Sequence, residues 1–75
     1  MYTYILTIDG MKCGMCEAHI NDLIRKEIKS AIKIKSNHKK NLTTFKSLED
    51  LDLNYIKEII IKTGYRVLDI RKEVD

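Results

Sequence analysis

Proline is absent from this sequence, and only three glycines and two cysteines occur among its 75 residues. Thiol oxidoreductases of the thioredoxin type also carry a Cys-x-x-Cys pair at a helix start. They depend on a cis-proline that faces the cysteines, and they are usually longer than this chain. The missing proline therefore argues against that class of redox protein.

Aromatic side chains are also few, at 7% of the residues. RNA-binding modules that read bases on a sheet face need an aromatic-rich signature on their inner strands. Tyr4 and Phe45 alone do not supply that signature. The net charge of +3 is modest for a nucleic-acid binder but favours an acidic partner. We therefore expect no nucleic-acid partner.

No apolar run approaches the length of a membrane span, and the N-terminus lacks a signal-peptide pattern. These absences predict a cytoplasmic protein that does not insert into membranes. A hydrophobic fraction of 44% beside 33% charged residues is typical of a small globular domain, here a single one spanning residues 1–75. In a reducing compartment, a Cys-x-x-Cys pair is more often metal-binding or redox-active than a structural disulfide.

Hydrophobic periodicity predicts six elements in the order β-α-β-β-α-β. The first strand, Tyr2–Asp9, is rich in β-branched and aromatic residues and alternates two faces, with Tyr4, Leu6 and Ile8 on one of them. An amphipathic helix over residues 17–29 follows. The later elements are strands at 31–36 and 42–46, a helix capped by Asp50 or Asp52 and ended by Gly64, and a strand at 66–71 before a tail that frays from Lys72.

This order predicts an α+β, ferredoxin-like sandwich, with a four-stranded antiparallel sheet and both helices on one face. Two points stay open: the second helix has two candidate caps, and either Leu42 and Thr44 or Thr43 and Phe45 face inward on the third strand. The topology places three segments at one end of the molecule. They are the cysteine loop, the polar hairpin at residues 37–41 and the Gly64-Tyr65 junction.

The segment Gly10-Met11-Lys12-Cys13-Gly14-Met15-Cys16 holds both cysteines between a strand and a helix. At a helix start, free N–H groups and the helix dipole stabilise an anion, so a thiol there deprotonates more easily. Two thiolates on a glycine-bearing loop suit a soft metal ion. Cys13 and Cys16 are therefore the candidate metal ligands.

The motif Gly10-Met11-x-Cys13-x-x-Cys16, with Gly64-Tyr65 before the final strand, resembles the heavy-metal-associated domain. That family comprises copper chaperones and small N-terminal domains of metal-transporting P-type ATPases, and the resemblance covers essentially the whole chain. It implies Cu(I), with Zn(II) or Hg(II) as other possible cargo, held by the two cysteines and passed to a partner by ligand exchange. The implied partner is such an ATPase or its metal-binding domain, and two copies could share one metal.

Four nearby residues have alternative roles. Lys12, where the family usually has Thr, Ser or His, either compensates the charge of the bis-thiolate complex or is an ordinary surface lysine. Tyr65 either shields the metal loop as a neighbour of the ligands or closes the end of the core. His19 is either an accessory ligand, which would favour zinc, or an exposed helical histidine; His38 is expected to lie too far away to bind.

The methionines of the motif have separate expectations. Met11 is expected to pack inward beneath the loop, and Met15 to face outward as an apolar contact for the partner. A basic rim around the same end would suit docking to an acidic surface and consists of Lys12, Lys39, Lys40, Lys62 and Arg66. Nothing resembles a three-ligand open site with a general base, so we expect no catalytic residue and no enzyme. The alternatives are a zinc carrier and a thiol–disulfide redox protein.

Overall fold

A computed structural model describes residues 1–74 of the chain. Its elements follow the predicted order and are β1 (Tyr2–Asp9), α1 (Gly14–Glu27), β2 (Ile32–Asn37), β3 (Leu42–Ser47), α2 (Leu53–Ile61) and β4 (Arg66–Val74). Neither helix in this part of the chain has the length and apolarity needed to span a membrane.

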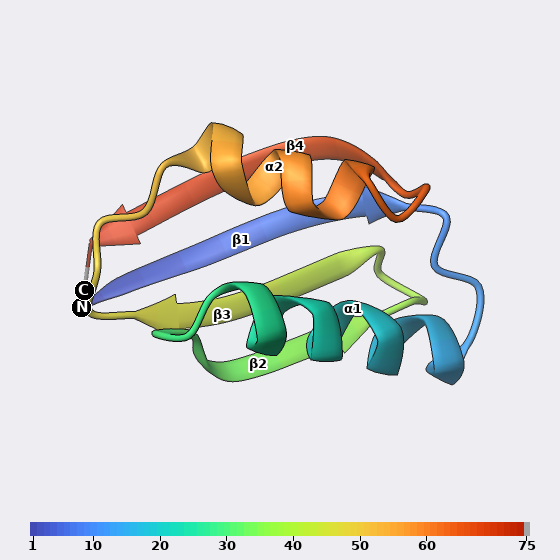
Figure 1. The fold of residues 1–75 in the computed structure, drawn as a ribbon. Helices are drawn as coiled ribbons and strands as arrows, with labels where there is room; N and C mark the ends of the chain where they lie inside the picture. The colour runs from blue at the N-terminus through green and yellow to red at the C-terminus, as the bar shows by residue number, and fades with distance from the viewer. Residues whose placement is uncertain (75) are drawn as a thin grey trace.

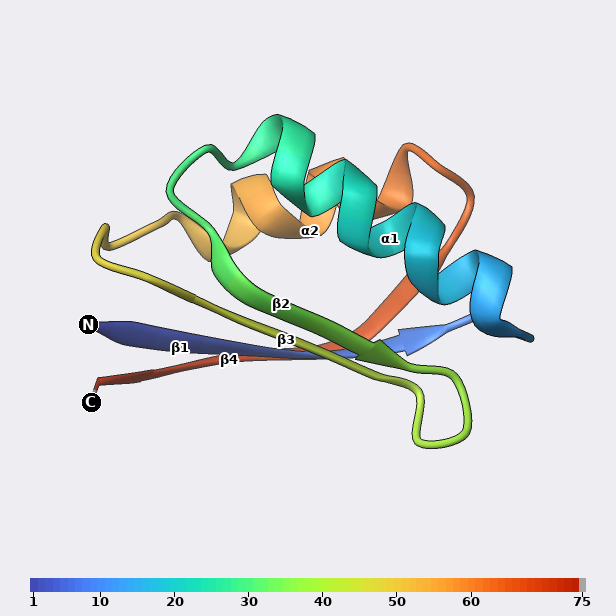
Figure 2. The same cartoon turned by 90° about the horizontal axis from the view of Figure 1, so that it is seen from below.

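The strands form one antiparallel sheet in the order β2-β3-β1-β4. Both helices lie on the same side of this sheet, and no element within residues 1–74 covers the opposite side (Figure 2). The predicted ferredoxin-like sandwich is therefore confirmed. The cysteine loop joins β1 to α1, and the hairpin joins β2 to β3. Both lie at the end of the molecule far from the two chain termini (Figure 1).

The core lies between the helices and the covered face of the sheet. Tyr4, Leu6 and Ile8 of β1 are fully buried, so the predicted inward face of this strand is confirmed. They pack in one cluster with the buried isoleucines of α1, of its C-cap residue and of α2, which are Ile20, Ile24, Ile28, Ile56, Ile59 and Ile60. Burial of these aliphatic side chains stabilises the fold by roughly 1.5–3 kcal/mol for each fully buried residue.

The inward face of β3, which the sequence left open, is formed by Thr43, Phe45 and Ser47. Phe45 stacks on Tyr4 with ring centroids 5.0 Å apart. The buried hydroxyls are satisfied, since Thr43 Oγ1 lies 2.8 Å from Ser36 Oγ and Ser47 Oγ donates to Ser30 Oγ at 2.7 Å. These partners allow two polar residues to lie inside an otherwise apolar layer.

Strand β2 departs from strict alternation near its start. Its register with β3 shifts between Ile32 and Lys35, and Lys33 has φ of 52°. The irregularity turns Ile32 outward, leaving it 45% exposed, while Ile34 packs against the core. A β-bulge of this kind inserts a residue and breaks the two-residue periodicity from which the strand was predicted.

The expected fraying from Lys72 was wrong, because β4 continues to Val74 and pairs there with Tyr2 of β1. Lys72 forms an ion pair with Asp50, and its Nζ lies 5.7 Å from the centroid of the Tyr2 ring. This ion pair and cation–π contact hold the end of β4 in the sheet. Asp52 caps α2, accepting from the Asn54 N–H at 2.9 Å, and settles the choice between the two candidate caps.

Candidate metal-binding site

The cysteine loop joins β1 to α1 across residues 10–13. Gly10 has φ of +110°, and a Cβ added there would lie 3.1 Å from the ring of Tyr65. The positive φ favours glycine, since side chains disfavour this backbone region, and an added Cβ would also have to displace the Tyr65 ring slightly. Met11 is 5% exposed and belongs to the core, as expected, which anchors the loop from beneath.

Helix α1 begins at Gly14, three residues earlier than predicted, with Cys13 as its N-cap residue. The Cys13 carbonyl accepts hydrogen bonds from the N–H groups of Cys16 and Glu17, at 3.1 and 3.3 Å. Cys16 therefore lies inside the first turn, while Cys13 precedes it in extended backbone. Both cysteines are free thiols; Cys13 is exposed and Cys16 is half-buried.

The thiol of Cys16 lies among groups that favour its anion. Hydrogen bonds from the Lys12 backbone and the Tyr65 hydroxyl, with a smaller contribution from Cys13, lower the pKa of Cys16 from 9.0 to about 7. The same hydrogen bond to Cys16 raises the pKa of Tyr65 above its ordinary value. A thiol with this pKa is substantially deprotonated at neutral pH and is ready to bind a cation.

Tyr65 is half-buried and follows Gly64, whose φ of +96° confirms the predicted positive φ. Helix α2 itself ends earlier than predicted, at Ile61 with Lys62 as its C-cap residue. The Tyr65 hydroxyl reaches the Cys16 thiol, and its ring lies against Gly10. One side chain therefore touches the loop on both sides of Met11. Both interpretations of Tyr65 from the sequence describe its position: it closes the end of the core and lies beside the cysteine pair.

His19 lies on the exposed side of α1, with its ring 6.1 Å from the Tyr65 ring in an edge-on arrangement. Among residues 1–74, no group of three or more His, Cys, Asp or Glu side chains is close enough to hold a metal ion. His19 therefore forms no three-ligand cluster with the two thiols in this part of the chain. His38 lies in the hairpin and contacts Glu17 instead, with Nδ1 2.6 Å from Glu17 Oε2.

The three predicted loops do gather at one end. The hairpin reaches α1 through His38 and Glu17, and the Gly64-Tyr65 junction reaches the cysteine loop through Tyr65. Met15 is 83% exposed at this end, as expected. The members of the basic rim are all exposed, but Arg66 is paired with Asp9 at 3.3 Å and is not a free charge.

Sequence reasoning gave no role to Glu17 or to Gly10 as a neighbour of Tyr65. Glu17 is the single acidic residue in the first turn of α1, and His38 lies in a hairpin that the topology places at the same end. An acidic residue beside the motif and a histidine in that hairpin were the available signals for an ion pair. The contact between Gly10 and Tyr65 left no such signal.

Comparison with known proteins gives matches only at the level of structure. No family model matches the sequence. No curated protein matches it either. Among solved structures, the yeast copper transporter domain CCC2A matches with a TM-score of 0.77 and 25% identity, covering 100% of this chain and 99% of that chain.

Two further structures show the same fold at lower identity. The CopZ metallochaperone has a TM-score of 0.77 and 22% identity, covering 88% of this chain and 98% of its own. A copper-binding domain from HMA7, a P-type ATPase, has a TM-score of 0.77 and 16% identity, covering 99% and 96%. Over essentially its whole described length, the chain therefore has the fold of these metallochaperone and copper-transporter domains.

Proposed function

We propose that this chain is one heavy-metal-associated domain that binds a single soft metal ion, Cu(I) foremost, between Cys13 and Cys16. The observation that carries the proposal is the pair of free thiols in mutual contact, one exposed and one with its pKa lowered to about 7. Cu(I) accepts two soft thiolates without needing nitrogen or further ligands. Binding replaces the thiol protons by the metal, so loading releases protons.

The different settings of the two cysteines support delivery to a partner. Cys16 is held in the first turn of α1, whereas Cys13 is exposed on the loop side. A thiolate of the partner adds to the bound ion, Cys13 leaves first, and Cys16 follows as the second partner thiolate binds. The ion passes between proteins in this way without entering water, and no bond to carbon is made or broken, so we propose a carrier and not an enzyme.

A metal-transporting P-type ATPase, or its metal-binding domain, is the proposed partner. The similar structures include a copper transporter domain, a metallochaperone and a P-type ATPase domain, which supports a transporter in general. The exposed lysines of the basic rim and the exposed Met15 would meet an acidic docking face with an apolar centre. Because both thiols must stay reduced for this exchange, we place the protein in the cytoplasm.

Anaerobic titration of the reduced protein tests the proposal. Cu(I), Zn(II) and Hg(II) are added in competition with a chelator, and stoichiometry and affinity are measured for the protein and for Cys13→Ser and Cys16→Ser. We expect one Cu(I) for each chain and a loss of binding in both variants. One ion for every two chains would indicate a metal-bridged homodimer, and undiminished Cu(I) binding in the serine variants would exclude the two-cysteine site.

Zinc handling is the first alternative, and it depends on His19. Zn(II) prefers four tetrahedral ligands, so His19 would have to leave the Tyr65 ring and turn toward the thiols. His19→Ala is expected to leave Cu(I) affinity almost unchanged. A loss confined to Zn(II), of roughly one to two decades, would move the assignment toward zinc.

The lowered pKa of Cys16 also suits a thiol–disulfide redox protein, the second alternative. A redox role requires the reduced pair to reduce a protein disulfide, forming its own Cys13–Cys16 disulfide as it does so. Incubation with a disulfide-bonded substrate protein and a reductant such as glutathione measures this turnover directly. We expect no catalytic turnover above that of glutathione alone.

A further inference from the structure

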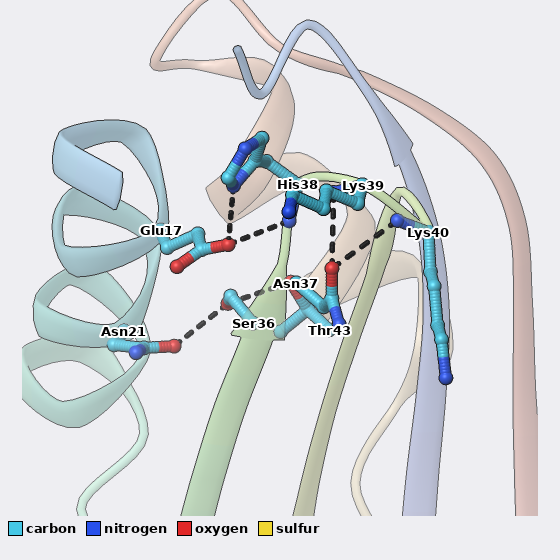
Figure 3. A network of polar contacts seen from close by, with 8 residues as sticks. All are labelled: Glu17, Asn21, Ser36, Asn37, His38, Lys39, Lys40 and Thr43. Atoms are coloured by element: carbon cyan, nitrogen blue, oxygen red, sulfur yellow. Dashed lines mark hydrogen bonds and ion pairs between the residues drawn. The ribbon is translucent and has the colours of Figure 1, made fainter. Parts of the chain in front are cut away.

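Glu17, which directly follows Cys16 in the chain, forms a two-point contact with His38 (Figure 3). A single oxygen of Glu17, Oε2, accepts the His38 backbone N–H at 2.7 Å and lies 2.6 Å from His38 Nδ1. The side chains are only 25% exposed for Glu17 and 30% for His38. Two contacts to one oxygen fix both the position of the hairpin and the direction of the carboxylate.

A second contact joins α1 to the end of β2, just before the hairpin, one helical turn further along α1. Ser36 Oγ donates to Asn21 Oδ1 at 2.7 Å and lies 2.8 Å from Thr43 Oγ1 (Figure 3). Glu17 and Asn21 are four residues apart on α1, so both contacts lie on one face of the helix. Only the Glu17 contact acts on the turn that carries Cys16.

The first turn of α1 has few hydrogen bonds of its own to hold it, so contacts with other elements, such as that of Glu17 with His38, become important. Its N-cap residue, Cys13, makes no side-chain hydrogen bond to the free N–H groups of the helix. A serine, threonine or aspartate at this position would typically contribute about 1 kcal/mol to helix stability. Because Cys13 provides no such cap, the turn holding Cys16 is fixed largely by what its own side chains contact.

The hairpin is itself a shaped and anchored segment. Asn37 Oδ1 accepts the N–H groups of Lys39 and Lys40 at 3.0 and 3.2 Å, and Asn41 has φ of 57°. The Asn41 carbonyl then accepts the N–H of Ile8 at 2.8 Å. The hairpin therefore contacts the chain just before the cysteine loop through Ile8 and just after it through Glu17.

We infer that the hairpin at residues 37–41 clamps both flanks of the cysteine loop, and that Glu17 and His38 are the positioning pair that holds Cys16 in place. The inference rests on the proposed metal binding by Cys13 and Cys16, and adds what fixes the geometry of the two sulfurs. With Ile8 and Glu17 held to one segment, the span of the loop is set before metal arrives. Cys13 then remains the ligand that can move.

Amide hydrogen exchange of the metal-free protein tests the clamp without any metal. In Glu17→Ala, we expect the amides of residues 16 and 17 to exchange about tenfold faster, because their turn opens locally. Glu17→Gln keeps an oxygen acceptor for the His38 N–H and should restore most of the protection. Asn21→Ala is the matched control, since it removes the neighbouring contact of α1 with Ser36 of β2 and leaves the Glu17 contact in place.

The rate of Cu(I) capture by an excess of chelator supplies the functional measurement. Glu17→Ala should release Cu(I) up to about tenfold faster, the lower end of the effect of losing a group that supports a ligand. His38→Ala retains its backbone N–H, so its rate of Cu(I) release should lie between those of Glu17→Ala and the unaltered protein. Asn21→Ala should release Cu(I) at the rate of the unaltered protein. Urea unfolding of each variant separates these effects from a general loss of stability.

The clamp is overturned if Glu17→Ala changes exchange and release no more than Asn21→Ala does. It is equally overturned if Glu17→Gln behaves like Glu17→Ala while the fold is intact. Failure of the underlying metal proposal gives a different pattern: Cu(I) binding would survive in Cys13→Ser and Cys16→Ser, whatever the exchange data show.

Discussion

The hydroxyl of Tyr65 hydrogen-bonds the thiol of Cys16, so the last loop of the chain touches the first. The contact lowers the pKa of Cys16 and raises that of Tyr65, which means that it favours the thiolate and the protonated phenol. Tyr65 therefore contacts the cysteine loop through its polar end as well as through its ring.

Tyr65→Phe removes this hydrogen bond while keeping the ring against Gly10. The pKa of Cys16 should rise from about 7 toward 9.0 without reaching it, because the larger contribution of the Lys12 backbone remains. Thiolate absorbance during a pH titration measures the change. A higher pKa makes protons stronger competitors, so apparent Cu(I) affinity should fall near neutral pH and recover in alkaline solution.

Tyr55→Phe is the control for this titration. The Tyr55 hydroxyl contacts the Glu27 carbonyl at 3.4 Å, at the other end of α1. Its removal should leave the pKa of Cys16 unchanged. Equal pKa values for the Cys16 thiol in Tyr65→Phe and Tyr55→Phe would contradict the role given to Tyr65.

Glu17 makes the stability of the protein depend on pH. Hydrogen bonds from the His38 backbone and ring hold the pKa of Glu17 below its ordinary value of 4.5. A carboxyl group whose pKa is lower in the folded state stabilises the fold when the pH is above the pKa of the unfolded state. This contribution disappears as the pH falls below 4.5. The difference in unfolding free energy between the protein and Glu17→Gln should therefore be present at neutral pH and shrink on acidification.

Urea unfolding at a series of pH values checks this. Asp22→Asn is the control, since Asp22 belongs to an exposed pair with Arg25 on the same helix. A difference between the protein and Glu17→Gln that stays constant from neutral pH to well below 4.5 would show that the carboxylate charge contributes nothing.

The fold should not require metal. Its core is closed by aliphatic and aromatic side chains, and no buried side-chain nitrogen or oxygen within residues 1–74 lacks a hydrogen-bond partner. Circular dichroism and amide chemical-shift dispersion of the metal-free and Cu(I)-loaded forms should differ little outside the cysteine loop. Collapse of the spectrum on chelation would instead indicate a domain folded by its metal, as in a zinc finger.

The basic rim should affect docking and leave metal binding intact. Changing Lys39 and Lys40 together to Glu should slow Cu(I) transfer to an acidic acceptor domain and weaken its dependence on salt, because exposed charges are screened. Stopped-flow transfer over a salt series measures this. The control changes Lys33 and Lys35 of β2 to Glu, which alters the net charge by the same amount away from the cysteine loop. Equal slowing of transfer in the two double variants would assign the effect to net charge alone.

Most of the fold could be predicted because each element carries a clear period. The alternation of Tyr4, Leu6 and Ile8 and the three-to-four spacing in α1 leave little choice of face. The misplaced details have local causes. At Lys33, a bulge interrupts the alternation of the strand. At Lys72, an ion pair with Asp50, which is distant in the sequence, extends β4 beyond the end of its hydrophobic pattern.

The cysteine pair could be identified from its spacing and flanking residues, since those residues are adjacent in sequence. The groups around it come from other elements, and their contacts depend on packing. Nothing in the sequence fixes which oxygen of Glu17 meets His38, or that Tyr65 occupies the space left by Gly10. Metal binding by the pair stays a prediction, and so does the metal that it prefers, because thiolates alone bind several soft ions.

The pairing of Tyr2 with Val74 places the beginning of β1 and the end of β4 side by side, at the end of the molecule opposite the cysteine loop (Figure 1). Any tether joined to either strand would leave in the direction away from the ion. If copies of the domain were connected in series, or one copy were fused to a larger protein, each cysteine loop would thus stay accessible to a partner. A surface probe or a resin attached by either strand would likewise present the thiols outward.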